Sequence, residues 1–148
     1  MVSASTGAQP SARSSTFGAG VYTTGWNDRT YAACLARAEG VAREGGRALV
    51  DASFREEGRR RTFLEAAVRL GVRGAFLLCE LPPATARARL GARRGDVSDA
   101  GAAVYERARA LWEEPSEPTR RALHRVPTEE VDAALEEARE GLGLSGLA

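Results

Sequence analysis

Apolar residues recur along the chain at two spacings, and these spacings predict where helices and strands lie. A repeat of three or four positions is the period of one helix face, whereas a short continuous apolar run is typical of a buried strand. The helical repeat predicts helices over residues 26–46, 55–70, 84–95, 96–115 and 127–143. Continuous apolar runs predict strands over residues 48–51, 74–81 and 122–126.

Residues that favour helix ends stand at the borders of these segments. Asn27 and Thr128 carry side-chain oxygens that suit the first residue of a helix. Gly45–Gly46 and Gly71 follow helical repeats, where glycine ends helices readily. Pro82–Pro83 stop the second strand, and proline is well placed to open the helix that follows.

The order of the elements predicts an α/β fold. Strands that alternate with helices, and that are continuously apolar rather than alternating, favour a parallel sheet covered by helices. Ligands of such sheets bind beyond the carboxyl ends of the strands. Asp51 falls at such an end, where a carboxylate is costly unless it is paired or bound.

Composition indicates a single domain with an irregular amino-terminal arm. The chain has 148 residues and a formal net charge of +1, which gives no overall attraction to nucleic acid or acidic membranes. Residues 1–20 are rich in Ser, Ala, Gly and Thr and lack periodicity, so we expect a loop or disordered arm before a domain over 21–148. Two isolated cysteines, no membrane-length apolar run and no secretory leader lead us to expect a cytoplasmic protein.

Every basic residue of the chain is arginine. The 21 Lys and Arg positions include no lysine, a bias that a GC-rich genome explains. Whatever its origin, the bias excludes chemistry that requires a lysine, including Schiff bases and the lysine of a phosphate-binding loop.

Three segments carry candidate chemistry, and each also has a plain structural interpretation. Asp51 in "ALVDAS" can hold Mg²⁺ through water beside a nucleotide, or it can cap the next helix. The arginines of "RARLGARRGDVSD" suit phosphate oxygens, or they form a solvated helix face. The segment "FREEGRRRTF" is typical of a salt-bridged surface helix. The polar and aromatic patch around Trp26 can contact a substrate or cap a helix.

Together these segments resemble a known family. The runs "GAGVYTTGWNDRTYAACLARAEGVAREGGRALVDASFREEGRRRTF", "LLCELPPATARARLGARR" and "DVSDAGAAVYERARALWEEP" are similar to the P-loop kinase domain of bacterial ATP-binding proteins. That domain is related to gluconate kinase, zeta-toxin and polynucleotide-kinase-type enzymes. The resemblance covers about residues 17–142, and it implies a three-layer parallel sheet and transfer of phosphate from ATP to a hydroxyl acceptor.

The resemblance also implies roles for individual residues. Asp51 would be the acid beside the magnesium ion. Arg89 and Arg93, with Arg94 beside them, would close on the ATP phosphates. The segment from Val126 through Pro127 and Thr128 to Glu129 would lie near the adenine. The residues expected on the acceptor side are Trp26, Arg29 and Arg55.

The sequence departs from this family at its start. The family opens with a strand and a G-x-x-x-x-G-K-[ST] loop, and that strand lies in the middle of the sheet, between the strands corresponding to 48–51 and 75–79. With no lysine present, the loop has no counterpart here. We therefore expect an incomplete, N-terminally truncated P-loop kinase-like domain that is inactive alone, with an upstream domain or partner supplying the strand. The alternatives are an interaction module that binds a partner or nucleotide weakly, and an unrelated small α/β enzyme with its own site.

Overall fold

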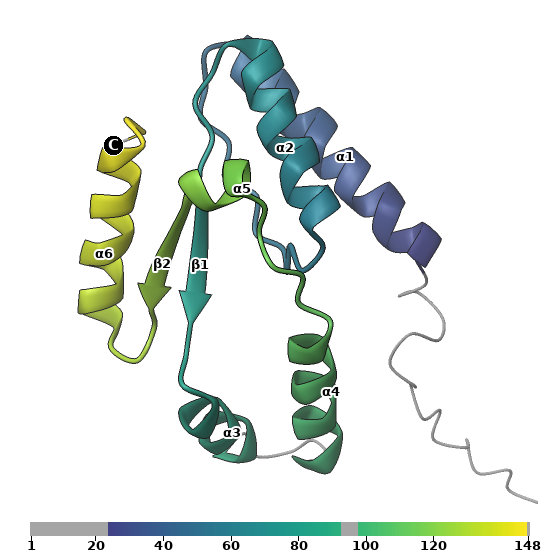
Figure 1. Ribbon diagram of the computed structural model, residues 1–148, viewed down its shortest axis with the longest axis vertical. Coiled ribbons are helices and arrows are strands. Elements are labelled where there is room, and N and C mark those ends of the chain that lie inside the picture. Colours follow the sequence, from purple (N-terminus) through teal and green to yellow (C-terminus); the bar gives the residue numbers. More distant parts are fainter. Residues whose placement is uncertain (1–23, 93–97, 148) are drawn as a thin grey trace, which may run out of the picture.

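The structure, a computed structural model, describes residues 24–92 and 98–147, which form six helices and two strands (Figure 1). The arm expected over residues 1–20 lies outside the described residues. In chain order the elements are α1 (Thr24–Arg43), α2 (Glu57–Leu70), β1 (Phe76–Glu80), α3 (Pro83–Ala92), α4 (Ser98–Ala110), α5 (Glu117–Arg121), β2 (Leu123–Pro127) and α6 (Val131–Leu144).

The two strands form a parallel sheet, as the apolar runs predict. Phe76 pairs with Leu123 at one end of the ladder, and Glu80 pairs with Pro127 at the other. The chain leaves β1, passes through α3, α4 and α5, and returns to run beside β1 in the same direction (Figure 1). The carboxyl ends of both strands therefore lie at one edge of the sheet. No helix in the described part of the chain is long and apolar enough to cross a membrane.

The predicted helix ends are confirmed at the glycines but not at Asn27. Gly45 and Gly71 both adopt positive φ angles, +78° and +69°, which residues with a Cβ atom rarely adopt. The N–H groups of Gly45 and Gly46 bond back into the last turn of α1 at 3.0 and 2.9 Å. Asn27 lies inside α1 rather than at its cap, because the helix begins at Thr24.

The strand predicted over 48–51 is wrong, so the described sheet is smaller than the predicted one. The described sheet has two strands, and residues 46–55 contain no regular element. Leu49 is 92% exposed, the opposite of a buried strand residue. An apolar run becomes a strand only where a neighbouring strand accepts its backbone hydrogen bonds. Within the described residues this segment has no such neighbour.

An aromatic cluster lies between α1, α2 and β1 and forms part of the core. The ring of Phe54 lies edge-on to three other rings, with centroid distances of 5.3 Å to Tyr31, 4.9 Å to Phe63 and 5.1 Å to Phe76. Such edge-to-face pairs add to the stabilisation that comes from burial. Phe54 is 8% exposed, so one side chain from the linker holds both helices against the sheet.

Phe54 also has an unusual backbone. Its φ angle of +43° is positive, a conformation that costs a bulky residue about 1–3 kcal/mol. Two side chains hold this conformation. The N–H of Phe54 donates to the Tyr31 hydroxyl at 3.0 Å, and its carbonyl accepts from the Arg60 guanidinium at 2.6 Å. The aromatic cluster and these two bonds together offset the backbone strain.

We predict that Phe54→Ala lowers the free energy of unfolding by about 3 kcal/mol, because it removes the central ring and leaves a cavity. Urea denaturation followed by circular dichroism measures the change. The matched control is Val68→Ala, at a position that is 78% exposed, which should alter stability by no more than about 0.5 kcal/mol. Equal losses in the two variants would contradict the central role of the Phe54 ring.

Candidate functional site

The carboxyl ends of β1 and β2 are joined by hydrogen bonds at Thr128. Both its N–H and its hydroxyl donate to the Glu80 carbonyl, at 2.8 and 2.9 Å. Thr128 therefore does not cap α6 as predicted; the helix begins at Val131, with Glu130 in the cap position. The side chain of Arg125 pairs with the Glu80 carboxylate on the same strands. These contacts hold the turn from β2 to α6 at the edge of the sheet.

Arg89 reaches this turn from α3. Its guanidinium donates to the carbonyls of Thr128 at 3.1 Å and Glu129 at 2.7 Å. The structure thus brings together two of the residues that the sequence singles out, Arg89 and Thr128. The two residues before Thr128 differ in exposure. Val126 is only 3% exposed and belongs to the core, whereas Pro127 is exposed.

Asp51 is not bonded to this turn within the described residues. It is exposed in the linker between α1 and α2, and within the described residues no hydrogen bond or ion pair joins it to Arg89 or Thr128. No group of three or more His, Cys, Asp and Glu side chains in the described part of the chain is arranged to hold a metal ion. Asp51 therefore stands as a single exposed carboxylate.

The remaining predicted residues are distributed as follows. Arg93 and Arg94 fall outside the described residues, and so does the side chain of Trp26, whose backbone belongs to α1. Arg29 is exposed on α1. Arg55 is half-buried just before α2, and its carbonyl accepts the backbone N–H of Glu113 at 3.0 Å. The residues expected on the acceptor side therefore come from α1 and from the linker that follows it.

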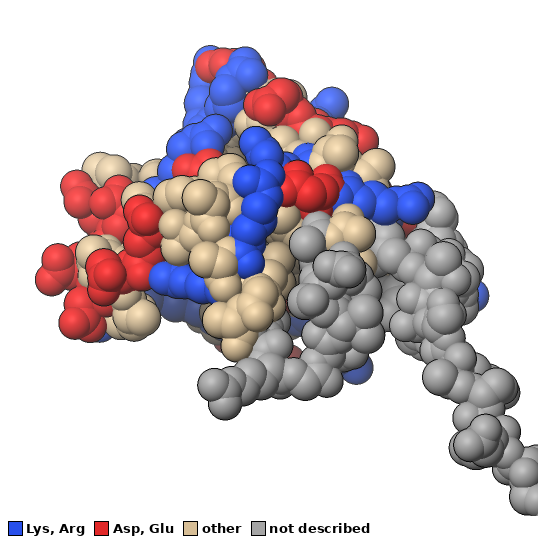
Figure 2. Space-filling model, turned by 90° about the horizontal axis from the view of Figure 1, so that it is seen from below, with Lys and Arg blue, Asp and Glu red and all other residues tan. Residues whose placement is uncertain are grey.

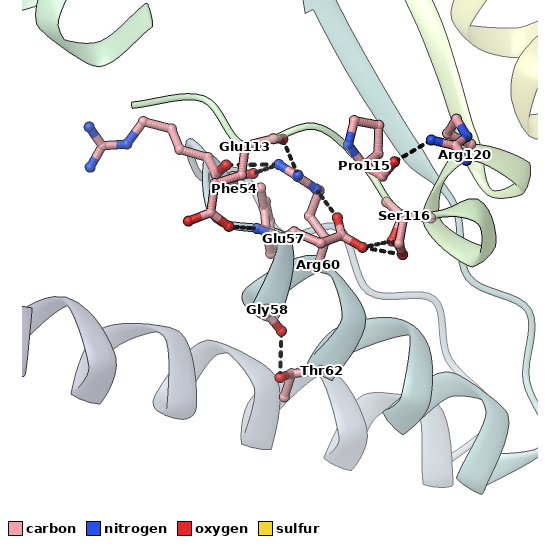
Figure 3. A network of polar contacts seen from close by, with 11 residues as sticks. Phe54, Glu57, Gly58, Arg60, Thr62, Glu113, Pro115, Ser116 and Arg120 are labelled. Carbon is pink, nitrogen blue, oxygen red and sulfur yellow. Dashed lines mark hydrogen bonds and ion pairs between the residues drawn. The ribbon is translucent and has the colours of Figure 1, made fainter. Parts of the chain in front are cut away.

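A second polar cluster, which the sequence did not reveal, surrounds Arg60 of α2 (Figure 3). The side chain is 1% exposed. Its guanidinium lies over the ring of Trp112, 4.4 Å from the centroid, which is a favourable cation–π position. The acceptors of its hydrogen bonds are the carboxylate of Glu57 (2.9 Å) and the carbonyls of Phe54 (2.6 Å), Arg55 (3.0 Å) and Glu113.

Glu57 completes the cluster from the first turn of α2. Its carboxylate accepts hydrogen bonds from the hydroxyls of Ser116 and Thr119, the latter at 2.7 Å (Figure 3). Burial raises the pKa of Glu57, but the hydrogen bonds from Ser116, Thr119 and Arg60 outweigh this effect and lower the pKa from 4.5 to about 2. The carboxylate is therefore charged at neutral pH, opposite a buried guanidinium.

The charged segment around Arg60 was predicted to be a salt-bridged surface helix, and this is confirmed for Arg61, which pairs with Glu65 at the surface. Arg59 also forms ion pairs, with Glu56 and Asp28, but its side chain is only 11% exposed. Arg60 differs because α5 and the residues before it cover that side of α2. The short helix α5, which the apolar pattern did not predict, contributes the fully buried Thr119. The i,i+3 spacing of Glu57 and Arg60 was visible in the sequence, but its burial was not.

These two clusters anchor the ends of a helical pair. α3 packs on α4, and two nitrogens of Arg87 donate hydrogen bonds to one carboxylate oxygen of Glu106, at 2.8 and 2.6 Å. Arg60 holds the segment that follows α4, whereas Arg89 holds α3 itself against the β2–α6 turn. The α3–α4 pair, at the lower end of the view in Figure 1, is thus tied to the rest of the fold on both sides.

Charge is unevenly spread around this end of the molecule. Figure 2 shows acidic side chains gathered on the side where α6 lies in Figure 1, whereas arginines and further acidic side chains are mixed over the rest of this face. α6 carries Asp132, Glu136, Glu137 and Glu140 against a single Arg139. An anion that approaches this edge is therefore attracted by arginines such as Arg89 and repelled by α6.

Two hollows lie elsewhere on the surface. One of about 480 Å³ lies between α5, β2 and α6, where His124 and Glu140 are among the lining residues. The other, of about 210 Å³, lies between α1 and α2 beside Tyr31 and Arg59. Neither is lined by Arg89 or Asp51.

Comparison with known proteins identifies the family. A family model described as an AAA domain, of the P-loop NTPase-like kinases, matches residues 3–115, which is more than half of the chain. The chain belongs to this family. The comparisons found no curated protein and no solved structure that matches it. The part that matches the AAA domain includes Asp51, Arg60 and Arg89, and it ends before β2, so Thr128 lies beyond it.

We predict that Glu57→Gln makes the stability of this AAA domain less dependent on pH. The pKa of Glu57 is lowered from 4.5 to about 2, so its charge contributes stability that is complete above pH 4.5 and is lost as the pH falls toward 2. The shift corresponds to about 3 kcal/mol at neutral pH. Urea denaturation at several pH values between 7 and 2.5 should show the difference between wild type and variant shrinking below pH 4.5.

The control for this measurement is Glu65→Gln. Glu65 is exposed and pairs with Arg61 on the same helix, so this variant should follow the wild-type pH curve closely. A difference between Glu57→Gln and wild type that stays constant from pH 7 to pH 2.5 would refute the charged, hydrogen-bonded state of Glu57.

Proposed function

We propose that this AAA domain binds ATP with Mg²⁺, belongs to a lineage that transfers phosphate to a hydroxyl acceptor, and does not carry out the transfer by itself. The observation that carries the second half of the proposal is the absence of lysine from all 148 residues. The family's phosphate-binding loop uses a lysine and a row of backbone N–H groups to stabilise the charge that develops during transfer. The described residues offer no such loop.

The position of Arg89 supports the nucleotide-binding half. It lies at the carboxyl ends of two parallel strands, the edge at which α/β proteins bind their ligands. Its planar guanidinium suits phosphate oxygens better than an ammonium group does. The adjacent turn around Thr128 is the segment that we propose for the adenine, with Val126 and Pro127 leading into it. Arg93 and Arg94 follow Arg89 in the sequence and are proposed to bind phosphate as well.

The proposed magnesium acid is Asp51. When bound, the ion would neutralise phosphate charge, and an exposed carboxylate such as Asp51 would hold it through water. One carboxylate and one guanidinium, not linked to each other, do not form a complete site for Mg²⁺ and ATP. We therefore assign no chemical step to the described residues. Trp26, Arg29 and Arg55 are proposed on the acceptor side.

Two features support the proposal that another polypeptide segment completes this site. β1 has β2 on one side and, within the described residues, no strand on the other. Leu49, in the linker that the sequence predicted to be a strand, is 92% exposed. A partner or a further segment that supplied the central strand could pair with the open side of β1 by β-augmentation and bring the phosphate-binding loop. The same features favour the alternative function, an interaction module without catalysis.

The test is to measure nucleotide binding and turnover by the chain of residues 1–148. With magnesium and ATP we expect no phosphate release above the protein-free rate. Calorimetric titration should give weak binding, with Kd on the order of 1 mM. Asp51→Asn should weaken binding when Mg²⁺ is present and leave it unchanged when Mg²⁺ is removed, whereas the control Glu65→Gln should match wild type in both conditions.

Three outcomes separate the readings. ATP turnover that is lost in Asp51→Asn would contradict the proposal that the chain is inactive by itself. Saturable binding that responds to Asp51 supports an incomplete nucleotide site. No binding of ATP at any concentration, together with cooperative unfolding of the soluble chain, would replace the nucleotide site with the interaction module.

A further inference from the structure

The hollow of about 480 Å³ between α5, β2 and α6 offers apolar surface to solvent. Leu123 of β2 and Pro115, which precedes α5, are among its lining residues, and Leu144 lines it from α6. Leu144 is 76% exposed, so most of its side chain is left uncovered within the described residues. Apolar surface that is rimmed by polar side chains is typical of a place where another molecule binds.

One face of α6 forms a wall of this hollow. Its lining residues are three or four positions apart, which is the spacing of a single helix face: Glu137, Glu140, Gly141 and Leu144. Gly141 is buried against His124 of β2, and a Cβ atom at Gly141 would lie 2.9 Å from the Cβ of His124. The Nε2 atom of His124 also lies 2.8 Å from the Ser145 hydroxyl oxygen, at the end of the same helix. The close approach of α6 to β2 therefore requires glycine here, and it fixes the wall that carries the two carboxylates.

The unpaired charges of the hollow are negative. Two arginines line it, but each pairs with a carboxylate that does not: Arg120 with Glu117, and Arg125 with Glu80. The carboxylates that do line it are exposed, and their side chains form no hydrogen bond or ion pair within the described residues. They are those of Glu114, Glu137 and Glu140. Because Glu114 precedes α5 and the other two lie on α6, negative charge stands on two walls of the hollow.

We propose that this hollow is a docking groove for a basic segment of a partner protein, in which arginine or lysine side chains flank an apolar residue. The apolar residue covers Leu123 and Leu144, and the basic residues pair with the carboxylates on the two walls. Charge complementarity selects this occupant, because an apolar surface alone accepts any apolar chain whereas unpaired carboxylates repel acidic ones. Carboxylates on two walls favour at least two cations, which a polypeptide segment supplies together with the apolar residue.

This docking groove does not depend on nucleotide binding. Apart from Glu114 and Pro115, its lining residues lie beyond the part of the chain that matches the AAA domain, residues 3–115. Neither Arg89 nor Asp51 lines it. The groove therefore adds a class of partner to the proposed function, and it stands whether or not the chain binds ATP.

Fluorescence anisotropy of a labelled peptide, titrated with the full chain, tests the groove. The peptide Gly-Arg-Arg-Leu-Arg-Arg-Gly should bind with Kd on the order of 10 μM, and the peptide with glutamate in place of each arginine should not bind. The double variant Glu137→Gln with Glu140→Gln should raise the Kd about tenfold, since two charge-assisted contacts are lost. The matched control, Asp132→Asn with Glu136→Gln, removes the same charge from α6 at positions that do not line the hollow. Its Kd should stay within about twofold of wild type.

A second pair of measurements tests the apolar half of the groove. Replacing the leucine of the peptide by serine should raise the Kd about tenfold, because the burial of an apolar side chain is lost. Leu144→Ala should raise the Kd for the leucine peptide, whereas the control Val68→Ala, at a position that is 78% exposed on α2, should leave it unchanged. The circular dichroism of each variant verifies its fold.

The possible results distinguish this occupant from others. Equal losses in the two double variants would overturn the groove, because general attraction to the acidic helix would then explain the binding. Spermine that displaces the peptide and binds as tightly would replace the partner protein with a small organic cation. Absence of peptide binding at about 1 mM would overturn the proposal outright. Saturable binding that needs both the lining carboxylates and Leu144, with or without ATP, supports it.

Discussion

The fold depends on a buried arginine. Arg60 is almost wholly removed from water, and an unpaired guanidinium there would destabilise the protein by several kcal/mol. Here three backbone carbonyls and the Glu57 carboxylate accept its hydrogen bonds, and Trp112 covers its face. The requirement to satisfy this one group brings together α2, the linker before it and the chain that follows α4.

The same requirement links the aromatic core to the chain that follows α4. The Phe54 carbonyl that Arg60 binds belongs to the residue at the centre of the aromatic cluster, and the positive φ angle of Phe54 turns that carbonyl toward the guanidinium. From the other side, the bond to the Glu113 carbonyl fixes the chain after α4. The packing of the Phe54 ring and the hydrogen bonds of Arg60 therefore stabilise the same segment of the chain. In this way a small apolar core can hold several elements together.

Arg60 and Arg89 thus hold the α3–α4 pair in different ways. Arg60 is buried and multiply bonded, so its contacts form with the fold itself. Arg89 is exposed and donates to two carbonyls, so solvent has access to its contacts. A residue type that fills all 21 Lys and Arg positions of the chain therefore forms a buried anchor in one place and a solvent-accessible link in another. Burial decides which of these roles each side chain has.

The sequence by itself determined the local features of this protein. Periodicity located five of the six described helices and both described strands, because amphipathic and continuous apolar patterns are properties of neighbouring residues. Gly45 and Gly71 marked helix ends because their lack of a Cβ atom allows positive φ angles. The arginine-rich segment around Arg89 and the family resemblance were likewise readable from the residues alone, and the family match confirmed the P-loop kinase-like class.

Only the tertiary structure decided which of these features meet. The segment 48–51 has the composition of a strand, yet Leu49 is exposed, since pairing depends on a neighbouring strand and not on the segment itself. Thr128 looked like a helix cap but bonds to Glu80, because β1 and β2 end side by side. Arg60 looked like the exposed Arg61 beside it but is buried, because α5 and Trp112 fold over it. Long-range contacts of this kind are set by the packing of elements, and no local pattern records them.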